Sequence, residues 1–154
     1  MTEKPMLAMA VVVATARLLL IRRAVPEGGL LWALPGGSVE AGETACQAAV
    51  REALEETGLA VEAVADLGER IHPDTDRRIV YVACRLLAGD ARPASLREVA
   101  EIAWVTPVEV PQYVPQGLFP AVQEHLARLA EPDATGPGVR TSRQAIPPES
   151  LHSP

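Results

Sequence analysis

The first forty residues alternate between apolar runs and short breaks, a pattern typical of strands joined by tight turns. Residues 6–14 (MLAMAVVVA) are rich in Val and Ala without helical periodicity, and they predict a buried strand. Residues 18–23 (LLLIRR) predict a second strand that ends on two arginines. A proline and a Gly-Gly pair predict a loop over residues 24–29. The extended stretch 32–37 breaks at Pro-Gly-Gly and resumes over 38–40.

Two later segments have helical character. Residues 44–57 are mostly strong helix formers, and Gly58 is well placed to end the helix. Strand-like runs follow at 60–67, 78–87 and 102–105, and residues 119–130 predict an amphipathic helix. This order of elements predicts an α/β domain in which helices flank a mixed sheet. The expected apolar face of the first helix consists of Ala45, Ala49, Val50, Ala53 and Leu54.

Length and composition predict the domain organisation. The 154 residues suit one domain, and because aromatic residues make up only 3%, Ala, Val and Leu must fill its core. From residue 131 onward the composition shifts to Pro, Gly, Ser and Thr, which lack the apolar content to offset the entropy cost of ordering. We therefore expect a domain over 1–130 and an irregular or disordered tail over 131–154.

The net charge and the distribution of apolar residues limit the kinds of binding partner and the cellular location that we expect. The net charge of −6 argues against an electrostatic nucleic-acid binder. It is compatible with a small phosphorylated ligand, because a bound divalent cation reverses the local charge. The apolar run over 6–16 is too short to cross a bilayer, and the first residues lack a signal-peptide pattern. We expect a cytoplasmic protein that binds neither nucleic acid nor membrane, with Cys46 and Cys84 as buried free thiols.

The first predicted helix carries three clustered glutamates. Glu52, Glu55 and Glu56 lie at positions i, i+3 and i+4, so their carboxylates share one face of the helix. Hard oxygen ligands at this density suit Mg²⁺ or Mn²⁺. The alternative is a solvated glutamate face, which is the usual role of a charge run. The preceding Pro-Gly-Gly favours the metal interpretation, since glycines let the backbone approach a ligand closely.

The glutamates belong to a longer motif. Residues 37–59 read GSVEAGETACQAAVREALEETGL, which resembles the signature of the Nudix hydrolase family, G-x5-E-x7-R-E-U-x-E-E-x-G-U, where U is a bulky apolar residue. Leu59 satisfies the last U position, whereas Ala53 at the first is smaller than usual. The strand-loop-strand segment before the motif also looks like the segment that precedes it in MutT-like members of the family. We therefore extend the resemblance over residues 6–130. The fixed positions are matched by Gly37, Glu43, Arg51, Glu52, Glu55, Glu56 and Gly58.

The resemblance implies an α/β/α sandwich and a Mg²⁺-dependent pyrophosphohydrolase, with Mn²⁺ as the alternative metal. The implied reaction cuts a diphosphate linkage in a small nucleotide, first of all a nucleoside triphosphate, to give a monophosphate and pyrophosphate. ADP-ribose or another nucleoside diphosphate derivative is the alternative substrate, and a catalytically silent nucleotide-sensing domain is the alternative of another class. The chain contains no asparagine, so the asparagine with which typical MutT members read an oxidised guanine is missing. We expect a monomer or a homodimer.

The resemblance also implies residue roles within the motif. The carbonyl of Gly36 and the carboxylates of Glu52, Glu55 and Glu56 correspond to metal ligands, and these three glutamates are the catalytic candidates. Gly37, Glu43, Arg51 and Gly58 correspond to structural positions, with Glu43 and Arg51 forming an ion pair that orients the loop and the helix.

Outside the motif the sequence offers further candidates. A later acidic residue often serves as ligand or base in this family; Glu101 is preferred here over Glu98, and either is alternatively a solvated charge. Arg22, Arg23 and Arg77 are candidates for binding phosphate, because a guanidinium group matches phosphate oxygens with two donors. Solvated strand ends are the alternative for Arg22 and Arg23, and His72 is either a substrate contact or a surface loop residue.

Overall fold

The computed structural model describes residues 4–27 and 30–130. The predicted tail over 131–154 lies outside these residues. No helix within the described ranges is both long and apolar enough to cross a membrane. The strands are β1 (Leu7–Ala14), β2 (Arg17–Glu27), β3 (Leu30–Ala33), β4 (Gly36–Ser38), β5 (Ala60–Ile71), β6 (Arg78–Ala88) and β7 (Val99–Val105). The helices are α1 (Ala45–Thr57), α2 (Val110–Tyr113) and α3 (Pro120–Ala130).

The seven strands of the described residues form one mixed sheet. Its main path runs β3-β2-β1-β6-β5, with β4 paired to β1 and β7 paired to β2. The central pair β1 and β6 is parallel, whereas the other pairs are antiparallel. The predicted mixed sheet is therefore confirmed, and β1, whose residues are all buried or half-buried, lies at its centre.

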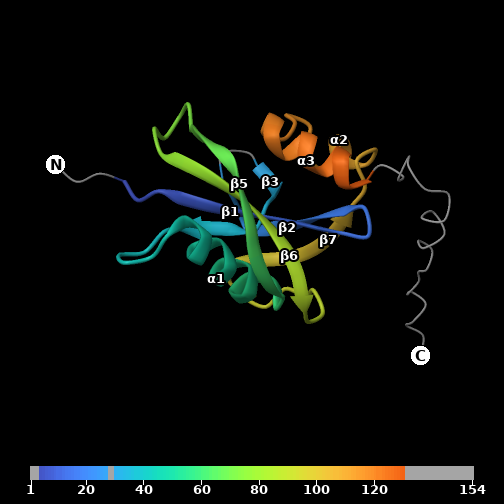
Figure 1. Cartoon of the computed structure of the whole chain (residues 1–154), viewed down its shortest axis with the longest axis horizontal. Helices are drawn as coiled ribbons and strands as arrows, with labels where there is room; N and C mark the ends of the chain where they lie inside the picture. The colour runs from blue at the N-terminus through green and yellow to red at the C-terminus, as the bar shows by residue number, and fades with distance from the viewer. Residues whose placement is uncertain (1–3, 28–29, 131–154) are drawn as a thin grey trace.

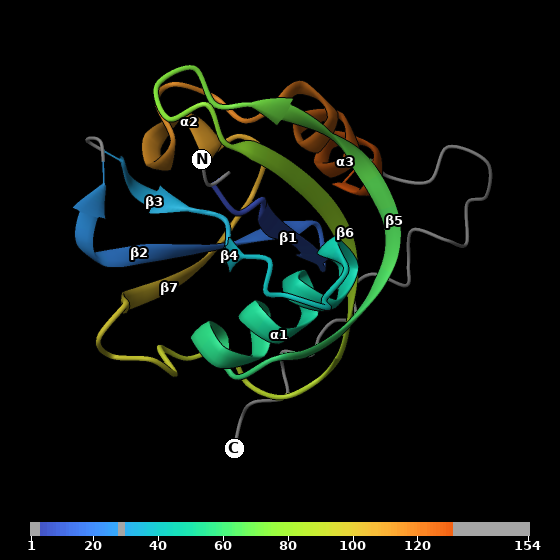
Figure 2. The ribbon, with the colours of Figure 1, turned by 90° about the vertical axis from the view of Figure 1, so that its left-hand side faces the viewer.

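Helices cover both faces of this sheet (Figures 1 and 2). On one face α1 packs its buried alanines against β1, β5 and β6. On the other face α2 and α3 bury Val110, Val122 and Leu126 against a second apolar cluster. The predicted α/β/α sandwich is confirmed, with α1 and the pair α2–α3 as its outer layers.

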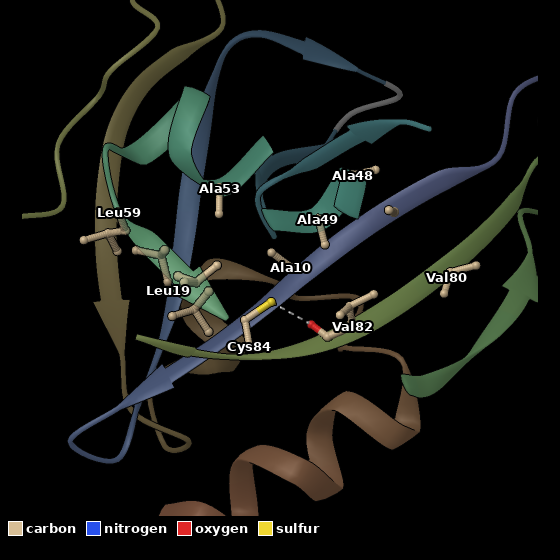
Figure 3. Close-up of a cluster of buried hydrophobic side chains, with 12 residues drawn as sticks. Ala10, Leu19, Ala48, Ala49, Ala53, Leu59, Val80, Val82 and Cys84 are labelled. Carbon is tan, nitrogen blue, oxygen red and sulfur yellow. Dashed lines mark hydrogen bonds between the residues drawn. The ribbon is translucent and has the colours of Figure 1, made fainter. Parts of the chain in front are cut away.

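Small side chains let α1 approach the sheet closely. Ala48, Ala49 and Ala53 are fully buried, and Figure 3 shows them above β6, the strand that carries Val82 and Cys84. The prediction that Leu54 belongs to this face is wrong, because Leu54 is 53% exposed. The helix is rotated so that Ala48 and the acidic Glu56 face inward instead.

The ends of α1 follow the sequence closely. Thr44 precedes the helix as its N-cap, where its side chain accepts from Gln47 N and Gln47 Oε1 accepts from Thr44 N. This capping box satisfies two backbone donors of the first turn. Gly58 ends the helix in the left-handed region, with φ at 78°. The predicted helix end at Gly58 is confirmed.

Several elements differ from the prediction because of pairing between distant strands. β2 continues to Glu27 instead of ending at Arg23, since it gains partners from both β3 and β7. β5 continues to Ile71 because β6 pairs along its whole length. The four-residue helix α2 was not predicted.

The two cysteines differ in burial. Cys84 is buried as predicted, its Sγ donates to Val82 O at 3.5 Å, and desolvation raises its pKa to about 11 (Figure 3). The prediction for Cys46 is wrong, because Cys46 is exposed on α1.

Candidate active site

Glu56 is the buried carboxylate at the centre of the site. It is 2% exposed on the inner side of α1, where its Oε1 accepts from Gly36 N at 3.0 Å. No second hydrogen bond to this carboxylate is found in the part of the chain that the structure describes. Burial raises the pKa of Glu56 to about 8, because the ionised form loses hydration. The site therefore contains a desolvated carboxylate that a cation would stabilise.

Glu52 lies one helical turn earlier, against β4. A Cβ on Gly37 would come within 2.3 Å of Glu52 Oε2, so a glycine is required for this close approach. The side chain of Glu52 is 12% exposed, and desolvation raises its pKa as well. The backbone of β4 thus lies directly against both carboxylates.

Arg51 joins the motif's acidic residues. Its Nε donates to Glu43 Oε2 at 2.6 Å and its Nη2 donates to Glu43 Oε1 at 3.0 Å. These hydrogen bonds lower the pKa of Glu43 to about 2. The ion pair that the resemblance implies is present, and it ties the loop before α1 to the helix.

The same guanidinium group also holds two of the three clustered glutamates. Arg51 Nη1 donates to Glu52 Oε2 at 3.1 Å and to Glu55 Oε1 at 3.2 Å. Glu55 is the most exposed of the three glutamates, with 55% of its side chain accessible. Within the described residues no three acidic, His or Cys side chains form a group arranged to hold a metal ion.

The donor chemistry nevertheless fits a divalent cation. Mg²⁺ takes only one or two carboxylates and completes its shell with water and substrate phosphates, so three converged side chains are not required. Glu52 and Glu56 are two desolvated hard-oxygen donors beside the main chain of β4. Keeping both buried carboxylates ionised at neutral pH requires a compensating positive charge.

The two arginines at the end of the second predicted strand face opposite sides of the sheet. Adjacent residues of a strand alternate between faces, and Leu19 belongs to the α1 side whereas Leu20 belongs to the α2–α3 side. Arg22 therefore shares the face of Leu20, and Arg23 shares the face of Leu19. The charge of Arg23 lowers the pKa of Glu56, an effect smaller than the rise caused by burial.

Glu101 lies on β7, directly opposite Arg22 on β2. The two residues are cross-strand partners, and Arg22 Nη2 donates to Glu101 Oε2 at 2.9 Å. Ala103, two residues further along β7, packs on the α2–α3 side, so Glu101 shares that face. The structure therefore does not bring Glu101 to the glutamate cluster, because the pleat of β7 directs it to the other side.

Glu98 is the later acidic residue that lies near the cluster. Its charge adds to desolvation in raising the pKa of both Glu52 and Glu56. The loop that carries Glu98 is fastened to the end of α1, because Arg92 N donates to Thr57 O at 2.9 Å and Ala94 N donates to Glu56 O at 3.0 Å. No sequence motif marks this loop, so its attachment to α1 is visible only in the structure.

Arg77 and His72 make local contacts near the start of β6. Arg77 Nε donates to Pro5 O at 3.0 Å, and Arg77 Nη2 donates to Ser38 Oγ at 2.9 Å. His72 Nδ1 accepts from Asp74 N and Thr75 N, which stabilises the turn between β5 and β6. His72 is thus placed as a loop residue, while Arg77 reaches the strand that contacts the carboxylates.

The fold and the site together define an α/β/α sandwich with an acidic helix packed on a Gly-Gly strand. The chain belongs to the NUDIX domain family, whose sequence model matches residues 4–128. Members of this family that are hydrolases generally use divalent metals.

The chain is similar to several curated proteins. It is 38% identical over 122 residues to "Putative mutator protein MutT4" of Mycobacterium tuberculosis, covering 73% of this chain and 46% of that protein. It is 38% identical over 98 residues to "Putative 8-oxo-dGTP diphosphatase" of Bacillus subtilis, covering 63% of this chain and 62% of that protein. A stretch of 62 residues is 47% identical to "ADP-ribose pyrophosphatase" of Methanocaldococcus jannaschii, covering 40% and 37% of the two chains. The chain thus spans less than two thirds of the length of each of these relatives.

A solved structure supports the same assignment. The crystal structure of a NUDIX hydrolase from Nitrosomonas europaea superposes with a TM-score of 0.67 at 26% sequence identity. The superposition covers 84% of this chain and 72% of that one.

Proposed function

We propose that the protein is a metal-dependent pyrophosphohydrolase that cleaves a diphosphate linkage in a nucleotide, with a nucleoside triphosphate as the first substrate class. The observation that carries this proposal is the desolvated pair Glu52 and Glu56, packed against the Gly36–Gly37 backbone. A domain used only for sensing would have no need to bury two carboxylates whose ionised forms are this costly.

Mg²⁺, or Mn²⁺ as the alternative, would be held by Glu52, Glu55, Glu56 and the Gly36 carbonyl. When bound, the cation supplies neutralisation of the diphosphate and a lowered pKa for reacting water. Arg51 would keep Glu52 and Glu55 within reach of the cation, since its Nη1 already contacts both.

The remaining roles fall to residues on the α1 side of the sheet. Arg23 would bind a phosphate oxygen, because its charge acts on Glu56 whereas Arg22 is paired with Glu101. Glu98 would accept the proton of the attacking water, because its charge acts on the two buried carboxylates. Glu101 remains the alternative that the sequence favours, and substitution decides between the two.

The choice of substrate class draws on the relatives. One relative is named "Putative 8-oxo-dGTP diphosphatase", and 8-oxo-dGTP is a nucleoside triphosphate. Another relative is named "ADP-ribose pyrophosphatase". We place nucleoside triphosphates first because the match to the former covers more of this chain. The missing asparagine argues against oxidised guanine as the particular base.

The test is a hydrolysis screen with Mg²⁺ or Mn²⁺ against nucleoside triphosphates, 8-oxo-dGTP, ADP-ribose and nucleoside diphosphate sugars. Release of a monophosphate and pyrophosphate from a triphosphate is the expected result. Preferential release of AMP from ADP-ribose would move the protein to the second substrate class. An absence of metal-dependent turnover on every compound would refute the proposal and support the sensing domain.

Matched glutamine variants assign the glutamates. We expect Glu56→Gln and Glu98→Gln to abolish most turnover, and Glu101→Gln to have a small effect. Glu124→Gln, on the exposed side of α3, is the control for the loss of one surface charge. A large loss in Glu101→Gln with normal turnover in Glu98→Gln would reverse the assignment of the base.

A further inference from the structure

Each residue of the short strand β4 contacts a different residue of the acidic helix α1. Gly36 N donates to Glu56, Gly37 packs against Glu52, and the Ser38 carbonyl accepts from Arg51 Nη2 at 3.1 Å. A displacement of β4 along or away from α1 would therefore move all three contacts at once. The geometry of the carboxylates depends on how firmly β4 is held.

β4 is held by β1 on one side, and the pairing brings it close to β6. Leu7 of β1 is the partner of Ser38 in β4 and of Ile79 in β6. These three residues therefore lie side by side across the sheet. Arg77, which directly precedes β6, is near enough to reach across β1 to Ser38.

Arg77 uses this position to bind protein atoms on both neighbouring segments. Its Nη2 donates to Ser38 Oγ at 2.9 Å, and its Nε donates to Pro5 O, just before β1. Both side chains of the Arg77–Ser38 pair are half-buried. Ser38 thus accepts hydrogen bonds from two arginines: its carbonyl accepts from Arg51 and its hydroxyl accepts from Arg77.

We propose that Arg77 and Ser38 form a positioning pair that fixes β4, and with it Gly36 and Gly37, against the metal-binding carboxylates. Arg77 would then act through Ser38 and not through contact with the substrate. Groups that orient metal ligands in this way typically change metal affinity when removed, although they do not touch the metal. The inference rests on the proposed function for its activity readout only, since metal binding is measured separately.

The test is a double-mutant cycle of Ser38→Ala and Arg77→Ala, read by Mn²⁺ affinity, kcat, KM and Tm. We expect Ser38→Ala to weaken Mn²⁺ binding by about tenfold, to lower kcat and to leave KM nearly unchanged. We expect no further effect of Ser38→Ala in the Arg77→Ala background. Ser38→Thr, which retains the hydroxyl, should restore both Mn²⁺ affinity and kcat.

Arg78→Ala is the matched control, because Arg78 is an adjacent, exposed arginine whose ionic partner is Glu69. A rise in KM for Arg77→Ala together with normal kinetics for Ser38→Ala would overturn the inference and make Arg77 a substrate contact. Independent, additive losses in the two variants would also overturn it, as would a lower Tm with unchanged Mn²⁺ affinity and kcat. If the wild-type protein binds Mn²⁺ but hydrolyses no nucleotide, the proposed function fails, while the Mn²⁺ affinities still decide the positioning role.

Discussion

Substitution of Gly37 by alanine separates the geometry of the site from the stability of the fold. Gly37 lies in β4 with an ordinary strand conformation, since its φ is not among the positive values found in this chain. An alanine is therefore compatible with the backbone. Its Cβ, however, would come within 2.3 Å of Glu52 Oε2 and within 2.6 Å of Glu52 Cδ.

The size of the effect follows from these distances. The Glu52 carboxylate would have to move by about 1 Å to regain an ordinary contact distance. The end of a glutamate side chain moves at little cost to folding, so we expect Tm to change by only a few degrees. A misplacement of about 1 Å in a catalytic group costs about a hundredfold in rate, or ~2.7 kcal/mol in the activation barrier.

Gly36→Ala is the matched comparison, because its Cβ would meet backbone atoms instead. It would lie 2.4 Å from Ala8 O and 2.9 Å from Met9 Cα, and neither atom can move without displacing β1. We expect this overpacking to destabilise the fold by about 1–3 kcal/mol, which lowers Tm by about 2–4 °C per kcal/mol. The assays are metal-dependent pyrophosphate release and thermal unfolding. Near-normal turnover in Gly37→Ala would refute the reasoning, as would an unchanged Tm in Gly36→Ala.

Three further predictions follow from the contacts of the site. Burial raises the pKa of Glu56 from 4.5 to about 8, so between these pH values the folded state keeps a proton that the unfolded chain releases. The free energy of unfolding therefore falls as the pH rises from about 4.5 to about 8. In EDTA, Glu56→Gln should therefore show a higher Tm than wild type at pH 8 but not at pH 4; equal shifts at both would contradict this. Arg23→Ala should raise KM more than Arg22→Ala does, because the guanidinium group of Arg22 is already paired with the Glu101 carboxylate. The reverse order would exclude Arg23 as the phosphate contact. Thr44→Ala should cost about 1 kcal/mol in thermal unfolding at nearly constant kcat, and an unchanged Tm would show that the cap contributes little.

The sequence by itself determined the elements whose causes are local. The helix that carries the glutamates begins at a capping residue, Thr44, and ends at Gly58, and both signals depend only on neighbouring residues. The apolar runs predicted β1 and β6 because buried strands in a central position need continuous hydrophobic sequence. The family motif identified the acidic helix because its spacing brings the carboxylates onto one part of the helix surface.

Only the tertiary structure decided which side each residue faces. Leu54 is exposed and Glu56 is buried because β4 packs on one side of α1, a contact between segments that are distant in the chain. Helical periodicity alone assigns the apolar Leu54 to the buried face of α1 and a charged residue to the exposed face. It therefore could not predict that Glu56 faces the sheet.

The same limit applies to the candidates outside the motif. Arg22 and Arg23 are equivalent in sequence, but the pleat of β2 directs one to Glu101 and the other to the α1 side of the sheet. The charge of Glu98 acts on the carboxylates because hydrogen bonds from Arg92 N and Ala94 N fasten its loop to the end of α1. These placements depend on strand register and on long-range backbone hydrogen bonds, which no local pattern of residues encodes.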